Sequence, residues 1–335
     1  MSIAALRALV ASVPQVELSE PAEVLQAVAA EVAYLESKEA IDSIAMDTYW
    51  PKWSGPWWIM LLLHELGLSE RIPHRVVSAM VDGLAATPLH LFPIHAEDWP
   101  PGADRRLASH CHCALGNIDQ LLAACGVDVD RALPWFAPWY ARYQMADGGY
   151  NCDESAYLVK DECPSSMVGT VAPCEAMIQR APSDTCDRAA GFLIERELRR
   201  GSSTLHNASE RKSAESWGAL CFPRFYFYDV LRGASSLIHW ASAHGRPLPG
   251  RAIAPVIEEL VARHPDGIVR LGRAAFEGKA TFAEEDGTWS RRPAFEGSLL
   301  TQVSRPGAAS PALTRRWADT RRELLALIDA GQLTG

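Results

Sequence analysis

The sequence lacks any apolar run long enough to cross a membrane. Its longest strongly apolar stretch, residues 57–63, ends at His64 and Glu65, well short of the roughly 20 residues that a transmembrane helix needs. Residues 1–7 follow the pattern of an amphipathic helix and contain neither the basic segment nor the cleavage site of a signal peptide. We therefore expect a cytoplasmic protein without a membrane span.

An excess of basic charge is also absent. The 32 Lys and Arg residues are outnumbered by 41 Asp and Glu residues, which gives a net charge of −9. Because a protein that holds a nucleic-acid backbone needs several cations to neutralise phosphates, we expect no nucleic-acid partner. The chain has no low-complexity segment and no long block of like charge, which predicts a folded protein whose oligomeric state is left open.

Sustained alternation of apolar and polar residues, the signature of strands, is scarce, whereas a helical plan recurs. Four segments each contain an aromatic or small-residue start, an apolar helix, a break and a second helix, at a spacing of roughly 55 to 60 residues. The starts lie near Gly55, Ser109, Ser165 and Phe222, and the breaks are Gly67, Gly126, Pro182 and Gly245. This periodicity predicts a series of helical hairpins.

The first helix of each hairpin is strongly apolar, and the second is amphipathic. The apolar helices are expected at 58–66, 115–124 and 230–240. In the amphipathic segment 253–263, apolar side chains recur on one face, and Pro255 is expected in the first turn, where its missing N–H group costs nothing. Helices of these two kinds predict an all-α protein with an inner ring inside an outer ring.

Further helices at both ends of the chain would complete five to six hairpins. They are expected at 3–13, 22–35 and 312–330, and the long connections at 88–106, 147–164, 201–223 and 265–311. Connections of this length are usually functional or covering segments. None resembles a linker, so we predict one domain, 1–335. Its core repeats would span about 55–290, with N-terminal helices within 1–40 and a C-terminal helix at 312–332.

Tryptophan, tyrosine and glycine recur in a spaced pattern at Trp135, Trp139, Tyr143-Gln144 and Gly148-Gly149-Tyr150. This pattern resembles the glutamine–tryptophan repeat of the terpenoid cyclase and protein prenyltransferase superfamily. Residues 286–289 look like a degraded second copy, and residues 222–233 are similar to the start of an inner helix in bacterial prenyltransferase-like proteins. The resemblance implies an α/α toroid with its ligand cavity at the centre of the inner ring.

Metal-capable side chains gather at two of the hairpin starts. They are His110, Cys111 and Cys113 before the second apolar helix, and Cys152 and Asp153 after a tight turn predicted at Asp147-Gly148-Gly149. We predict that three of them bind zinc or a similar divalent metal and leave a fourth position open. Protein prenyltransferases likewise hold zinc with an aspartate, a cysteine and a histidine, although their aspartate precedes the cysteine with one residue between them.

Free thiols in a reducing compartment also pack as small apolar residues, and this interpretation stays open for the whole cluster. We also apply it to four cysteines outside the cluster, which we interpret as structural. They are Cys163, Cys174, Cys186 and Cys221.

Acids and aromatic residues supply further candidates. General acid or base roles are assigned to Asp153, Glu154, His206 and Asp229. Substrate contacts are assigned to Trp57, Tyr150, Arg211, Arg224, Tyr226, Tyr228 and Arg232. Aromatic packing, an intrahelical ion pair between Asp229 and Arg232 and a solvated loop around His206 explain the same residues structurally.

Terpene cyclisation is disfavoured because the sequence contains no DxDD and no DDxxD motif. The preferred hypothesis is a metal-dependent transferase, lyase or hydrolase that acts on a small organic substrate in the central cavity. Two alternatives remain. One is a metal-free prenyltransferase-like or cyclase-like enzyme that acts on an isoprenoid, and the other is a toroid that binds a hydrophobic ligand without catalysis.

Overall fold

The computed structural model describes residues 1–86, 111–274, 276, 280–285, 288–293 and 297–335. Within these residues the protein is mostly helical, which confirms the predicted all-α class. No helix among them is both long and apolar enough to cross a membrane.

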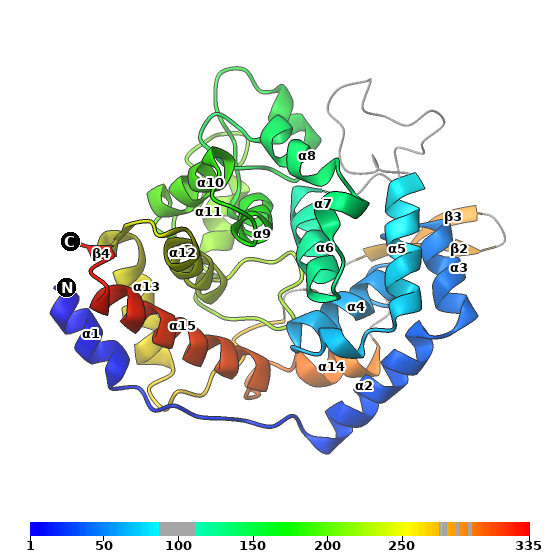
Figure 1. Cartoon of the computed structure of the whole chain (residues 1–335), viewed down its shortest axis with the longest axis horizontal. Helices are drawn as coiled ribbons and strands as arrows, with labels where there is room; N and C mark the ends of the chain where they lie inside the picture. The colour runs from blue at the N-terminus through cyan, green and yellow to red at the C-terminus, as the bar shows by residue number, and fades with distance from the viewer. Residues whose placement is uncertain (87–110, 275, 277–279, 286–287, 294–296) are drawn as a thin grey trace.

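Five helices surround the centre of the molecule (Figure 1). They are α4 (Pro56–Glu65), α6 (His112–Ala124), α9 (Met167–Ile178), α12 (Val230–His244) and α15 (Pro311–Asp329). Each contacts the next in this order. The Arg315 guanidinium of α15 donates to the Leu66 carbonyl at the end of α4 at 2.8 Å, so the series returns to its start.

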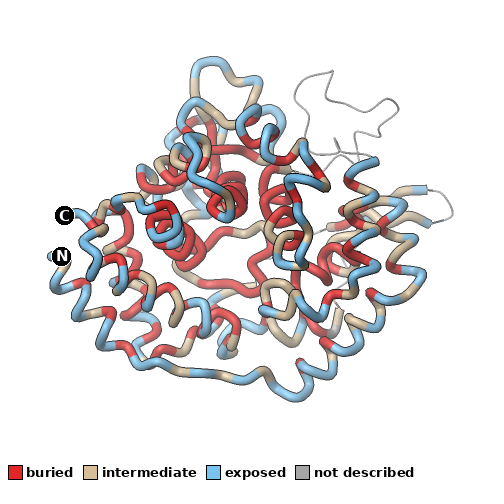
Figure 2. Tube along the Cα trace, in the orientation of Figure 1, coloured by how far each residue is buried: buried red, intermediate tan, exposed pale blue. Residues whose placement is uncertain are grey.

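The remaining helices pack around these five. They are α1 (Ile3–Ala11), α2 (Ala22–Leu35), α3 (Lys38–Met46), α5 (His74–Ala86), α7 (Val129–Ala132), α8 (Phe136–Tyr143), α10 (Asp184–Glu195), α11 (Ser209–Ala214), α13 (Gly250–Arg263) and α14 (Ser298–Val303). Figure 2 shows buried residues concentrated on α4, α6, α9 and α12, whereas α15 and the outer helices alternate buried and exposed positions. This distribution matches the apolar and amphipathic patterns in the sequence.

The helix ends follow the predicted breaks. Gly67, Gly126 and Gly245 follow α4, α6 and α12 with φ of +76°, +82° and +62°, a left-handed conformation that glycine adopts at little cost and that ends a helix. Pro182 precedes Ser183, whose side chain caps α10. The predicted helix 22–35 matches α2, and the predicted 312–330 differs from α15 by one residue at each end.

Two details of the predicted pattern were wrong or missed. Pro255 lies inside α13 rather than in its first turn, because the helix begins earlier, at Gly250. The structure also contains short strands that the sequence pattern did not reveal. They are β1 (Leu248–Pro249) parallel to β4 (Leu333–Thr334), and β2 (Ala280–Glu285) antiparallel to β3 (Thr288–Pro293). The β2–β3 hairpin is largely half-buried, so its apolar alternation is weak.

The long connections are partly structured. Residues 147–164 contain the 3₁₀ turn η3 (Glu154–Leu158), residues 201–223 contain α11, and residues 265–311 contain β2, β3 and α14. The connection 88–106 lies outside the described residues, as do Asp286 and Gly287 of the second repeat-like motif.

Candidate functional site

A tight turn after α8 directs the chain toward the start of α6. Gly148 has φ of +88°, and a Cβ atom there would lie 2.3 Å from the Arg188 carbonyl oxygen. The Gln144 side chain donates to the Gly148 carbonyl at 2.9 Å, and the Tyr150 carbonyl accepts the Ser166 N–H at 2.8 Å. The glycine turn predicted from the sequence is therefore confirmed, and it leads directly into Cys152.

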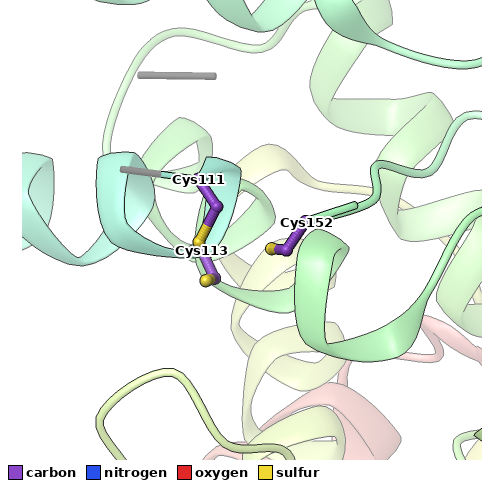
Figure 3. Close-up of side chains that lie close together, drawn as sticks. All are labelled: Cys111, Cys113 and Cys152. Carbon is purple, nitrogen blue, oxygen red and sulfur yellow. The ribbon is translucent and has the colours of Figure 1, made fainter. Parts of the chain in front are cut away.

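Three thiols converge between this segment and the first turn of α6. Cys111 is the N-cap residue of α6, Cys113 lies within its first turn, and Cys152 approaches from the other segment (Figure 3). The three Sγ atoms lie within 4.8 Å of one another. Cys113 is 1% exposed, and the other two cysteines are half-buried. Two segments that lie 39 positions apart in the sequence, from Cys113 to Cys152, thus contribute to one compact group of sulfur atoms.

The three thiols differ in the direction of their pKa shifts. Hydrogen bonds from the Cys113 and Cys152 thiols, with another from the Ala114 N–H group, lower the pKa of Cys111 well below its usual range. Burial raises the pKa of Cys113, and the hydrogen bond to Cys111 raises that of Cys152. The N-terminus of a helix favours one negative charge at Cys111. A cation is what would allow all three sulfur atoms to become thiolates together.

The cluster fits a zinc-like ion. Three thiolates at about 2.3 Å from a tetrahedral zinc ion are roughly 3.8 Å apart, so the sulfur atoms would need to approach by about 1 Å at most. No other His, Cys, Asp or Glu of the described residues joins this group. His110, also predicted as a ligand, lies outside the described residues. A fourth position would be filled by water, a substrate atom or a further ligand.

Asp153, the remaining predicted ligand, is not part of the thiol group. Its carboxylate caps η3 by accepting the Ser155 N–H at 3.0 Å, and its Oδ2 atom lies 2.9 Å from His206 Nε2. The structure therefore brings together Asp153 and His206, two predicted acid or base residues. Glu154, the third, is exposed at the first position of η3.

Aromatic rings surround the thiols. His112 is 1% exposed, and its ring lies 5.3 to 5.6 Å from those of Tyr143, Tyr150 and Tyr157. Burial lowers the pKa of His112 to about 4, which keeps its ring neutral at physiological pH.

Tyr49 and Tyr226 lie close enough for the thiols to influence them, because burial and then the thiol charges raise the pKa of both hydroxyls. The Lys52 ammonium is 5.5 Å from the centre of the Tyr49 ring and 5.1 Å from that of Tyr226, distances at which a cation is attracted to an aromatic face. Tyr226, a predicted substrate contact, is thus near both the thiols and a cation.

The segment before α12 passes between the central helices. Glu65 of α4 accepts the N–H groups of Arg224 and Phe225 at 2.7 and 2.5 Å, while the Phe225 carbonyl accepts the Asn117 side chain at 3.0 Å. Phe225 has φ of +48° and stacks on Trp53, whose φ is +71°. Two non-glycine residues in this conformation indicate backbone strain that their surroundings must offset.

A cavity of about 250 Å³ lies among the five central helices and is lined mostly by polar and charged side chains. At its wall, Arg232 donates to Glu175 through Nη2 at 2.6 Å and through Nε at 3.1 Å, and Ser236 donates to the same carboxylate at 2.9 Å. Arg232 lowers the pKa of Glu175 to about 2 against the opposing effect of burial. Neither Cys111, Cys113 nor Cys152 lines this cavity.

Arg224 and Arg232, both predicted substrate contacts, line the cavity, whereas other predicted contacts pack elsewhere. Trp57 is 1% exposed and lies against Tyr49 and Trp58. Arg211 donates to the backbone carbonyls of Ser202 and Thr204.

Three further candidates are fully buried. The hydroxyl of Tyr150 donates to the Tyr140 carbonyl at 2.9 Å, and that of Tyr228 donates to the Leu198 carbonyl at 2.8 Å. Asp229 caps α12 by accepting the Arg232 N–H at 2.8 Å, and burial raises the pKa of its carboxyl.

Sequence reasoning did not single out Glu175 or Arg316 as residues of the cavity. Glu175 is a charged residue inside the apolar helix α9, and a charge in such a position is almost always paired. That signal was available in the sequence. For Arg316 there was none, because an arginine on the amphipathic helix α15 is expected to face solvent.

Comparison with protein-family models, curated proteins and solved structures gives no match for this chain.

Proposed function

We propose that this protein is an enzyme with an α/α-toroid fold, in which a zinc-like ion held by Cys111, Cys113 and Cys152 acts on a small organic substrate. The observation that carries the proposal is the convergence of three sulfur atoms within 4.8 Å from two separate segments. The closed series of contacts from α4 to α15 and back supports the toroid.

The donor set favours zinc over harder cations. Thiolates prefer soft or borderline metals such as zinc, whereas calcium and magnesium prefer oxygen ligands. A zinc ion with three protein ligands and one exchangeable position acts as a Lewis acid or lowers the pKa of a bound nucleophile. Cys111 and Cys152 are half-buried residues, whereas Cys113 is buried.

The central cavity gives no support to the isoprenoid and hydrophobic-ligand alternatives. Of its lining side chains, Leu61 and Ile178 are the aliphatic ones, and the others are polar or charged. An apolar ligand there would remove hydration from charged groups without replacing it. A compact polar ligand is the better fit for this cavity, which is separate from the three thiols.

Elemental analysis of protein purified without chelator tests the metal site. We expect stoichiometric zinc in the parent protein and its loss from Cys152→Ser. The matched control is Cys125→Ser, because Cys125 caps the opposite end of the same helix, α6, and should retain the metal. A parent protein free of transition metal, or a Cys111→Ser/Cys152→Ser double variant that retains it, would refute the proposal.

A further inference from the structure

Two guanidinium groups in the central cavity have hydrogen-bonding capacity that the described residues do not use. Arg224 contacts Glu65 through Nε at 3.5 Å, and its two Nη groups bond to no described residue. The Arg316 side chain makes no hydrogen bond or ion pair with any part of the chain that the structure describes. Both arginines line the cavity.

The carboxylates of the cavity are, by contrast, all engaged. Glu65 accepts two backbone N–H groups, and Glu175 accepts from Arg232 and Ser236. Towards the other end of α15, Asp319 pairs with Arg322 at 2.6 Å and Glu323 pairs with His239 at 3.0 Å. Each of these four acids therefore has a partner other than Arg316, and Glu65 is the one that contacts Arg224.

Net charge does not decide what the cavity binds, because four carboxylates and three guanidinium groups line it. The N–H groups of Arg224 and Arg316 that have no partner among the described residues indicate the kind of ligand instead. A guanidinium presents five N–H donors and no acceptor, so the ligand that suits these two arginines carries acceptor oxygens. Arg316 is an exposed residue at the edge of the cavity lining, yet the surrounding protein and the positive charge of Arg224 lower its pKa. Two cations that line one cavity favour an anion between them.

We propose that the central cavity binds a small organic oxyanion, with its carboxylate or phosphate group held by Arg224 and Arg316. The volume of about 250 Å³ lies just below the 300–1,000 Å³ typical of ligand pockets, so the ligand is compact. The polar lining leaves no apolar channel for a long hydrocarbon chain. This anion site does not rest on the proposed metal centre, because no thiol lines the cavity.

Isothermal titration with succinate, inorganic phosphate and glycerol tests this site. We expect saturable binding of at least one of the two anions and none of neutral glycerol, and the tighter anion identifies the group that is recognised. Arg316→Gln should weaken binding about 10- to 100-fold, because it removes charged hydrogen bonds. The control is Arg75→Gln, which removes the same charge from an exposed position of α5 outside the cavity and should bind like the parent.

A conservative variant separates a binding role from a structural one. Arg316→Lys keeps the charge but loses the planar donor pair, so its affinity should fall between those of the parent and Arg316→Gln while its melting temperature stays unchanged. Repeating the titration with Cys111→Ser should leave anion binding intact, which separates this site from the metal centre. Absence of saturable binding of both anions to the parent, or equal affinities of Arg316→Gln and Arg75→Gln, would overturn the proposal.

Discussion

At the residue scale, the pair of Glu175 and Arg232 shows how charge is accommodated at the centre of the molecule. The Arg232 side chain is 3% exposed and that of Glu175 is 16% exposed. Arg232 also donates to the Phe225 carbonyl at 2.7 Å and to Asn117 at 2.9 Å. Because each polar atom has a partner, the pair holds α6, α9 and α12 together instead of destabilising them.

Removing one partner of this pair should be more harmful than removing both. Arg232→Met leaves the mostly buried Glu175 carboxylate charged and without its main partner, and we expect a loss of about 3–5 kcal/mol of unfolding free energy. The Glu175→Met/Arg232→Met double variant should lose less than Arg232→Met alone, because no isolated charge remains. Urea denaturation at pH 7 measures the unfolding free energies of both variants. Additive losses in the double variant would show that the two charges act independently.

Glu210 is a second buried acid, and its pKa is raised, whereas that of Glu175 is lowered. Its Oε1 atom accepts the Met167 N–H at the start of α9 at 2.7 Å, and it lies 3.6 Å from Arg196. Burial nevertheless dominates and raises the pKa of Glu210 from 4.5 to about 7. The folded protein therefore keeps a proton that the unfolded chain has lost between these two pH values.

Stability should consequently fall as the pH rises through this window. Because the folded state binds more protons than the unfolded state between pH 4.5 and about 7, the unfolding free energy should drop by roughly 3 kcal/mol across it. Glu210→Gln should remove this part of the pH dependence, whereas Glu215→Gln, at a nearby exposed position, should not. Urea midpoints at pH 5 and pH 8 give the comparison. Parallel pH profiles for the parent and Glu210→Gln would contradict the assignment.

The residue types in the sequence predicted a metal-capable cluster, but they did not show which side chains belong to it. The sequence placed Cys111, Cys113 and Cys152 at neighbouring starts of helices, and the structure brings these three together. It also suggested Asp153, whose carboxylate instead caps η3. Successive residues of an extended segment point to opposite sides, so Cys152 and Asp153 cannot both face one ion easily. Whether Cys152 or Asp153 faces the cluster depends on the backbone conformation, which the residue types do not define.

At the element scale, the close approach of α6 and α9 supports both the thiol cluster and the cavity. A Cβ atom on Gly116 would lie 2.3 Å from the Ala172 carbonyl carbon and 2.4 Å from Pro173 N. Pro173 has no N–H group, and the Ala172 carbonyl next to it accepts the Gln120 side chain of α6 at 3.3 Å. The two backbones are thus in direct contact at a point where only glycine fits.

Gly116→Ala should therefore destabilise the protein although alanine is the better helix former. The propensity gain is about 1 kcal/mol, but separating two packed helices costs about 1–3 kcal/mol or more. Gly191→Ala in α10 is the matched control, because a Cβ atom there has nothing within 4 Å, and it should stabilise by about 0.4–1 kcal/mol. Thermal unfolding of both variants measures the contrast. A stabilised Gly116→Ala would show that the helices can separate without loss.

Helices were predictable where glycine or proline marks their ends and where apolar residues recur. The breaks at Gly67, Gly126 and Gly245 each carry the expected positive φ. The helix α3 was missed because it continues almost directly from α2 with no glycine or proline between them. The β2–β3 hairpin was missed because two half-exposed strands need little apolar alternation. Local patterns thus predict elements best when the elements are buried on one side.

At the scale of the whole molecule, the two ends of the chain meet. The helix α1 packs against α13 and α15, and Arg321 of α15 donates to the carbonyls of Val13 and Pro14. Figure 1 shows the two termini near each other at one side of the molecule. Contacts of such large sequence separation could not be read from local patterns, since only the folded arrangement defines them. They join the first and last helices of the chain.

The proposed metal ion would be a further connection of this long-range kind, because it would tie the start of α6 to the segment after the Gly148 turn. An ion that binds only the folded state stabilises it by about 2.7 kcal/mol when its free concentration is 100 times the dissociation constant. For a chain of 335 residues with an unfolding entropy of about 2.1 cal/mol/K per residue, this stabilisation corresponds to roughly 4 °C in melting temperature.

We therefore expect the melting temperature to rise with free zinc and to fall on chelation, by several degrees in each direction. The effect should weaken as the pH falls, because zinc must displace protons from the thiols of Cys113 and Cys152, whose pKa values are raised. Cys152→Ser should abolish the zinc response, and Cys125→Ser should retain it. A melting temperature that is independent of zinc and chelator in the parent protein would mean that the three thiols are a packed core cluster, since a bound ion cannot stabilise the folded state without this linkage.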